Sequence, residues 1–265
     1  VGRSLFVDAP RFAERSLELL FADCASDARC QAAFPRLRQD FARLLARAES
    51  EGVSGLVADP RTGELVQVRI DRDVIAGIVR GGLYSAFSRA LVPLAIERAL
   101  DGDLGPMMGL AAATASWSTD TMALGMGVGY LCAEDVEQAR ILNSSDLSFG
   151  FLRDSYYRFF LGACAVWPYE PLAAEMLAPR RVDVPALVIS GELDPITPPA
   201  SGERAFETFS SGVHLIVPGG EHTNGADPCI ARVMAEFLRN PQTGGREHRC
   251  VRQRPRPTFL TSTLG

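Results

Sequence analysis

Residues 182–224 contain a strand–helix–strand pattern that constrains the fold more than any other stretch of the chain. Pro185 opens a short apolar run, Ala186 to Ile189, which is typical of a strand buried on both faces of a parallel sheet, and Gly191 permits a sharp turn after it. A helical pattern separates this strand from a second one, Val213 to Val217. The order predicts an α/β unit with parallel strands.

An acid and a histidine follow these two strands. Asp194 comes just after the first strand and His222 just after the second. In open α/β sheets ligands bind at the carboxyl ends of the strands, so we expect both side chains at one edge, within hydrogen-bonding reach. Taken singly, such an Asp is more often a helix cap and such a His a surface or core residue. Their order matches the last third of the α/β-hydrolase pattern, Ser then Asp then His, and predicts that Asp194 and His222 are catalytic.

Composition excludes several other classes of protein. The chain has 265 residues, of which 47% are hydrophobic, enough for a large core. Its net charge of -5 argues against a nucleic-acid partner, and no apolar run of about 18 residues indicates a membrane segment. With only three histidines, a zinc site is not favoured, and no cofactor is expected.

The chain has six cysteines and no Cys-x-x-Cys motif. Six paired cysteines allow fifteen connectivities, and spacing alone cannot choose among them. Cys24 and Cys30 flank a short polar loop and could form a local bridge. Structural disulfides in an oxidising compartment are the simplest interpretation, which predicts a secreted protein.

The pattern of the whole chain predicts an α/β fold class. It corresponds to the C-terminal portion of an α/β-hydrolase sheet with a large, mainly helical cap. Residues 1–9 are expected to be a strand of the hydrolase core, residues 10–181 the helical cap, and residues 182–265 the core portion that carries Asp and His. A small hairpin is expected within residues 56–70. Alternating glycines over residues 124–131 suit an extended segment, with a helix as the alternative. Three strands are too few for such a sheet, so further strands must come from elsewhere.

Several short motifs carry a resemblance to a known family. They are Cys24-Ala-Ser-Asp-Ala-Arg-Cys30 with Ala33-Phe34-Pro35, Leu83-Tyr84-Ser85, Cys132-Ala-Glu-Asp135, Cys164-Ala-Val-Trp167, Gly191-Glu-Leu-Asp-Pro-Ile-Thr-Pro198 and Pro218-Gly-Gly-Glu-His222. With these motifs the chain resembles the tripeptidyl-aminopeptidase and proline-iminopeptidase-like serine hydrolases, in particular their secreted actinobacterial branch. Glu221 and Thr223 stand where that family usually has glycine on either side of the histidine.

The resemblance implies that His222 acts as general base and then acid, while Asp194 fixes its tautomer. It also implies two disulfides, Cys132 with Cys164 and Cys229 with Cys250. The family's nucleophile lies in a Gly-x-Ser-x-Gly turn, which this chain lacks, and neither Ser190 nor Ser85 is a good substitute. We therefore expect the serine in an N-terminal half of the same hydrolase.

The resemblance further implies a peptide substrate with a free N-terminus, held by acids of the cap. Glu134 and Asp135 match the family's cap motif, although Asp135 would also serve as a helix N-cap. Three functions stay open: an aminopeptidase, an esterase or lipase-like hydrolase with the same triad, and a non-catalytic remnant. Cap acids favour the aminopeptidase, because a buried ammonium needs a counter-charge.

Overall fold

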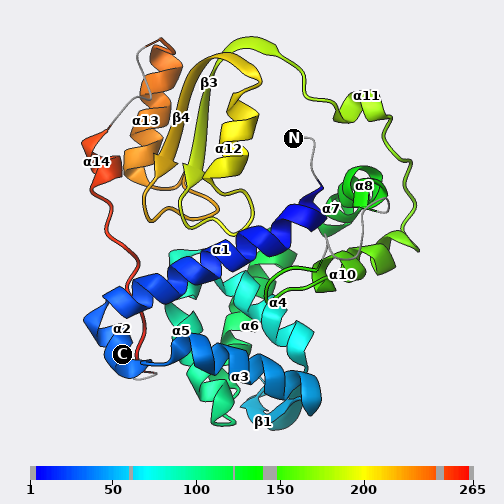
Figure 1. The fold of residues 1–265 in the computed structure, drawn as a ribbon, viewed down its shortest axis with the longest axis vertical. Coiled ribbons are helices and arrows are strands. Elements are labelled where there is room, and N and C mark those ends of the chain that lie inside the picture. The colour runs from blue at the N-terminus through cyan, green and yellow to red at the C-terminus, as the bar shows by residue number, and fades with distance from the viewer. Residues whose placement is uncertain (1–3, 60–61, 122, 140–147, 243–247, 263–265) are drawn as a thin grey trace.

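The computed structural model in Figure 1 describes residues 4–59, 62–121, 123–139, 148–242 and 248–262. A long helix, α1 (Leu5–Ser26), crosses the molecule between a small sheet with its own helices and the remaining helices (Figure 1). The elements between α1 and the sheet are α2 (Ala28–Ala33), α3 (Leu37–Ser50), β1 (Val53–Ala58), β2 (Leu65–Ile70), α4 (Arg72–Gly82), α5 (Ala86–Leu100), α6 (Gly105–Thr121), α7 (Leu124–Leu131), the π-helix η1 (Cys132–Val136), α8 (Glu137–Ala139), α10 (Ser155–Cys164) and α11 (Ala174–Leu177). The sheet portion consists of β3 (Val182–Gly191), α12 (Pro199–Phe206), β4 (Phe209–Val217), α13 (Pro228–Arg239) and α14 (Arg249–Arg252).

The prediction of a strand over residues 1–9 is wrong for the residues that the structure describes, because residues 5–9 form the first turns of α1. The Ser4 hydroxyl caps this helix by accepting a hydrogen bond from the Phe6 amide at 3.2 Å. Phe6, Ala9 and Ala13 are fully buried and recur at helical spacing. A short apolar run alone cannot separate a buried strand from a buried helix, and here the spacing continues along the helix.

The largest apolar core lies among the helices, with contributions from α1, α3, α4, α5 and α6. Its fully buried members include Leu20, Leu44, Ile75, Ile96 and Leu110. β1 and β2 form the antiparallel hairpin expected here, with Val53 opposite Ile70 and Ala58 opposite Leu65. Val53 and Ile70 are buried in the core, so one end of the hairpin is fixed to the helices.

Residues 124–131 are helical, which corrects the expectation of an extended segment. The glycines do mark a close approach, but the partner is a side chain. A Cβ atom on Gly125 would lie 3.0 Å from the Trp167 ring, and one on Gly129 would lie 3.4 Å from it. Because residues four apart lie on the same face of a helix, these two glycines form a flat surface for the indole ring.

A second apolar cluster joins the start of α1 to α7, η1 and α10. Phe6 lies at its centre, with the rings of Tyr156, Tyr157 and Phe160 all within 5.8 Å of it, centroid to centroid. The Cys132–Cys164 disulfide closes the same cluster from η1 to α10. The N-terminal end of α1 is therefore held by these three elements.

A tight loop, residues 149–153, connects the second cluster to the larger core. Gly150 has a φ of +58°, a conformation that glycine adopts without strain. The Phe151 amide donates to a carboxylate oxygen of Glu14 on α1 at 2.9 Å, and its carbonyl accepts from Arg72 on α4 at 2.7 Å. Both contacts hold loop backbone against long helices, so the loop has a fixed position.

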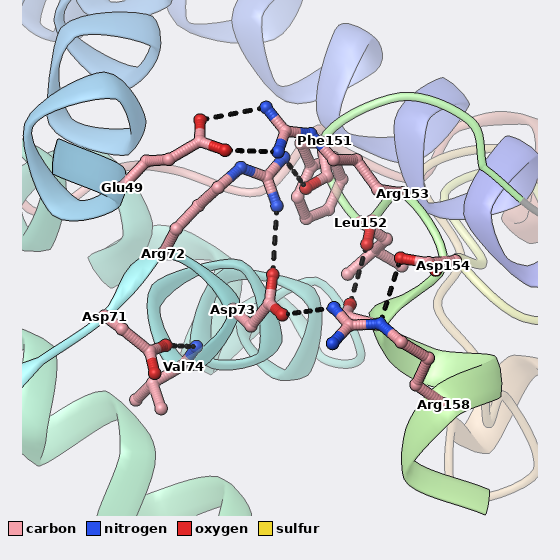
Figure 2. Close-up of polar contacts among 11 residues, drawn as sticks. Glu49, Asp71, Arg72, Asp73, Val74, Phe151, Leu152, Arg153, Asp154 and Arg158 are labelled. Carbon is pink, nitrogen blue, oxygen red and sulfur yellow. Dashed lines mark hydrogen bonds and ion pairs between the residues drawn. The ribbon is translucent and has the colours of Figure 1, made fainter. Parts of the chain in front are cut away.

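Figure 2 shows the ion pairs around this loop. Arg153 forms two hydrogen bonds, of 2.6 and 3.0 Å, with Glu49 on α3. Arg158 on α10 bridges Asp154, at 3.1 Å, and Asp73, at 2.7 Å. These pairs are largely exposed, and an exposed ion pair contributes little to stability alone. Arg158 joins α10 to α4, and Arg153 joins the loop before α10 to α3.

β3 and β4 run parallel, in register from Ala186 opposite Gly212 to Gly191 opposite Val217. Leu187 and Ile189 of β3 pack on the α13 side with Leu215 and Val217 of β4. α12 contacts both strands on the other face, so helices cover both faces of the sheet (Figure 1). This arrangement is the α/β unit predicted from residues 182–224.

The three predicted disulfides are confirmed: Cys24–Cys30, Cys132–Cys164 and Cys229–Cys250. The last of these holds α13 against α14, next to the core of the sheet portion. In the described part of the chain, no helix is long and apolar enough to cross a membrane. The mixture of helices and parallel strands is compatible with an α/β fold.

Candidate active site

Asp194 lies in the turn that follows β3 and is almost completely buried, at 2% exposure. One carboxylate oxygen accepts hydrogen bonds from the amides of Ile196, at 2.7 Å, and Thr197, at 2.9 Å. The other oxygen accepts from the Thr197 hydroxyl at 2.9 Å. Three donors within three residues therefore fix the orientation of the carboxylate, as a buried charge requires.

His222 lies in the turn that follows β4, and its side chain is 28% exposed. Its Nδ1 atom is 3.1 Å from each carboxylate oxygen of Asp194. The turn is braced by Asn224, whose amide oxygen accepts from the Glu221 amide at 3.1 Å and whose nitrogen donates to the Glu221 carbonyl at 2.8 Å. The structure thus brings Asp194 and His222 together, as the sequence predicted.

An ionised carboxylate can only accept hydrogen bonds, so the proton of the neutral imidazole lies on Nδ1 and Nε2 carries a lone pair. Burial alone would raise the pKa of Asp194, but the hydrogen bond and charge of His222, with the amides of Thr197 and Ile196, outweigh it and lower that pKa. The acid is therefore ionised at neutral pH. It can fix the tautomer of His222 and stabilise the imidazolium once a proton is taken up.

The two turns are joined by backbone as well as by this pair. The Glu192 amide donates to the Val217 carbonyl at 3.0 Å, and the Leu193 amide donates to the Gly220 carbonyl at 2.8 Å. The Glu192 carboxylate accepts from the Gly219 amide at 2.9 Å. These bonds act on the residues next to the acid and the histidine, and they set the separation of the two turns.

Gly191 is required where the two turns meet. A Cβ atom at this position would lie 2.0 Å from the Glu221 carbonyl oxygen and 2.7 Å from the Gly220 carbonyl carbon. Both are backbone atoms that cannot move aside independently. The absence of a side chain at Gly191 therefore lets the turn of His222 approach the end of β3.

Tyr84, between α4 and α5, completes the surroundings of His222. Its ring stands edge-on to the imidazole, 5.3 Å between centroids, and its carbonyl accepts from the His222 amide at 3.4 Å. The Arg80 guanidinium lies over the rings of Tyr84 and Tyr156, at 5.4 and 4.4 Å. Burial raises the pKa of Tyr84, so its hydroxyl stays protonated. No role was predicted from the sequence for Tyr84 or Arg80, although Tyr84 belongs to the motif Leu83-Tyr84-Ser85.

The two serines considered as nucleophiles have other partners. The Ser190 hydroxyl is 2.9 Å from Nε2 of His214, on the face of the sheet that α12 covers. Ser85 caps α5, with its hydroxyl accepting from the Ser88 amide at 3.2 Å. Within the residues that the structure describes, the His222 ring hydrogen-bonds to Asp194 and to no serine hydroxyl. The site therefore consists of an acid and a base.

Glu134 and Asp135 lie in η1 and differ in their surroundings. Asp135 is buried and accepts from the Leu5 amide at 2.6 Å, which satisfies a donor at the start of α1. Burial raises the pKa of Asp135, against the opposing hydrogen bonds from Leu5 and Ser4. Glu134 is half-buried beside Tyr130, whose pKa rises to about 12 through burial and then through the charge and hydrogen bond of Glu134.

Among the described residues, no group of three or more His, Cys, Asp or Glu side chains is arranged to hold a metal ion. Residues 151–250 match the family of TAP-like proteins. The match includes β3, β4, Asp194 and His222. It supports a TAP-like α/β-hydrolase family for this chain, and such a family suggests hydrolase activity. No curated protein matches the chain.

Gly191→Ala should strongly destabilise the protein, because the new methyl group would separate the two turns. We expect a loss of about 1–3 kcal/mol or more in the free energy of unfolding, measured by urea denaturation. Gly77→Ala is the matched control, since Gly77 lies inside α4 with open space around its Cβ position. This control should be neutral or stabilising by up to about 1 kcal/mol. Equal stability of the two variants would contradict the close approach at Gly191.

Asp194→Asn should lower stability in a pH-dependent way. Because the folded carboxyl titrates below its ordinary value of 3.8, its contribution is fully present above that value and is lost as the pH falls through the folded pKa. We expect the wild type to exceed Asp194→Asn in free energy of unfolding at neutral pH, and the gap to shrink below about pH 4. Urea titrations of both proteins across this range measure the gap. A gap that widens on acidification would contradict the lowered pKa.

Proposed function

We propose that this chain carries the acid and the base of a serine hydrolase that releases residues from the free N-terminus of peptides. The observation that carries the proposal is the pair of His222 Nδ1 with the buried, hydrogen-bonded carboxylate of Asp194, 3.1 Å apart at the carboxyl ends of two parallel strands. The similarity of residues 151–250 to TAP-like proteins supports the same class of chemistry.

In the proposed reaction, Nε2 of His222 takes the proton of a serine hydroxyl as its oxygen attacks the peptide carbonyl carbon. The imidazolium then gives this proton to the leaving amine, and an acyl-enzyme remains. A water molecule attacks the acyl group in the same way, and His222 returns the proton to the serine. Throughout, Asp194 keeps a proton on Nδ1 and stabilises the charged ring.

The serine is proposed to come from an N-terminal portion of the same hydrolase, which is also the proposed partner of this chain. In the described residues, β3 pairs with β4 alone, and Val182 and Val184 are 40% and 49% exposed. A parallel strand with helices on both faces is normally paired on both edges, and a free apolar edge favours addition of a strand. Added strands would extend the sheet and place a serine beside His222.

Recognition of the free amine is assigned, within this proposal, to the acids of η1. Glu134 and Asp135 supply the negative charge that an ammonium group needs when it leaves water. The bond of Asp135 to the Leu5 amide supports a structural role for that acid, which makes Glu134 the better candidate. An esterase would not require this charge, so the choice of substrate distinguishes the two activities.

A secreted location is part of the proposal. All six cysteines are paired, and three disulfides persist in oxidising compartments. The net charge of -5 argues against a nucleic-acid partner, and the proposed protein acts without a membrane or a cofactor.

Co-expression of the chain with the proposed N-terminal portion should give hydrolysis of aminoacyl anilides that a serine-directed covalent inhibitor abolishes. In that enzyme, His222→Ala should lower kcat by several orders of magnitude and Asp194→Asn by about 10⁴-fold, because the wrong tautomer forms. His248→Ala, at the start of α14, is the control and should keep full activity. An enzyme that keeps its rate after His222→Ala would refute the proposed mechanism.

Glu134→Gln should reduce kcat/KM for a free-amine peptide by about 30-fold, or about 2 kcal/mol, and leave an N-blocked ester nearly unaffected. Asp135→Ala is the comparison, since loss of the hydrogen bond to the Leu5 amide should affect both substrates equally. The two substrates are assayed side by side with each variant. Equal losses on both substrates for Glu134→Gln would remove Glu134 from amine recognition.

A further inference from the structure

Among the residues whose burial is described, Arg89 on α5 has the largest fully buried side chain, at 1% exposure, and it reaches α1. Its two terminal nitrogens donate to Ser16, one to the hydroxyl at 3.0 Å and one to the carbonyl at 2.9 Å. Burying a guanidinium is costly unless its donors are used, so this contact fixes α5 against one position of α1.

The Ser16 hydroxyl continues the contact into the candidate active site. While it accepts from Arg89, it donates to the Leu193 carbonyl at 2.7 Å. The Leu193 amide donates to the Gly220 carbonyl in the turn of His222. The residue directly before Asp194 is therefore held on one side by α1 and on the other by the turn that carries the histidine.

Charged side chains surround the Arg89 guanidinium. Asp23 is its nearest carboxylate, at 3.9 Å, and also lies 3.5 Å from Arg256. Arg256 in turn forms two 2.9 Å hydrogen bonds with Glu192. Burial lowers the pKa of Arg89 to about 10, partly opposed by the charge of Asp23, so the side chain remains protonated at neutral pH.

We propose that Arg89 and Ser16 are positioning residues that hold the Leu193 peptide so that the Asp194 carboxylate faces Nδ1 of His222. Helices outside the sheet portion thereby set the geometry of the acid. The catalytic meaning of this inference rests on the proposed function, whereas the positioning itself can be measured in this chain alone.

The test uses Ser16→Ala with Ser88→Ala as its matched control. Both serines are buried, but the hydrogen bonds that the described structure gives Ser88 go to Ser85, at the start of α5, and not to the turn of Asp194. In ¹⁵N-histidine-labelled protein at alkaline pH, NMR reports the ratio of Nδ1-protonated to Nε2-protonated imidazole for each of the three histidines.

We expect Ser16→Ala to lower this ratio for His222 about fivefold, the equivalent of one lost hydrogen bond, and Ser88→Ala to leave it unchanged. His214, on the other face of the sheet, and His248, at α14, should keep their wild-type signals in both variants and so report an intact fold. An unchanged His222 ratio in Ser16→Ala would overturn the proposal. Equal changes at all three histidines would also overturn it, because they would show general loosening.

Arg89→Lys gives a second measurement that does not depend on the serine. Lysine keeps the charge but cannot make both bonds in the geometry of a guanidinium. We expect a His222 ratio between those of the wild type and Ser16→Ala, and a wild-type ratio would count against the proposal. In the co-expressed enzyme, Ser16→Ala should lower kcat by a similar factor and leave KM unchanged. If the His222 ratio changes in Ser16→Ala but the co-expressed enzyme does not hydrolyse peptides, the proposed function is refuted and the positioning role stands.

Discussion

The structure depends on the burial of one ionised carboxylate. Asp194 is 2% exposed, and a charge that leaves water at this depth must be met by several donors. The Thr197 hydroxyl and two amides supply three of them, and the ring of His222 supplies the fourth. The lowered pKa of Asp194 shows that these donors outweigh the effect of burial. Because the donors come from the turns after β3 and β4, the parallel pairing of these strands is a requirement of the site.

Much of this site was predictable from the sequence because its determinants are local. A strand pattern followed by a turn places Asp194, a second strand pattern places His222, and parallel pairing brings the strand ends together. The β1–β2 hairpin was predictable for the same reason, since a turn sequence lies between two β-like runs. Gly191 signalled a sharp turn, but its more important role, the approach of the Glu221 backbone, depends on a residue 30 positions further along the chain.

The incorrect predictions concern segments whose structure is decided by distant partners. Residues 5–7 are an apolar run that suits a buried strand, but they begin α1, where Phe6 packs against α10. The glycines of residues 124–131 suit a close backbone approach, but Trp167 fills that space beside a helix. The motif Leu83-Tyr84-Ser85 contributed to the family resemblance but did not place Tyr84 beside His222, because the two residues are far apart in the chain. Hydrophobic periodicity reflects the local conformational preference of a segment, whereas the conformation of these segments depends on tertiary packing.

α1 connects the two parts of the molecule because it contacts each through different chemistry. Its apolar side lies in the helical core, with Leu17 and Leu20 fully buried, whereas Arg15 and Ser16 donate to the carbonyls of Glu192 and Leu193 in the turn of Asp194. The C-terminal segment crosses in the opposite direction, with Phe259 in the helical core and the Leu260 amide bonded to the Ala90 carbonyl at 3.0 Å. A shift of the helical part would therefore act on the backbone of the acid turn directly, through hydrogen bonds with defined directions. Helices joined to the sheet portion by apolar contacts alone could slide without moving the acid, and the polar contacts of α1 remove that freedom.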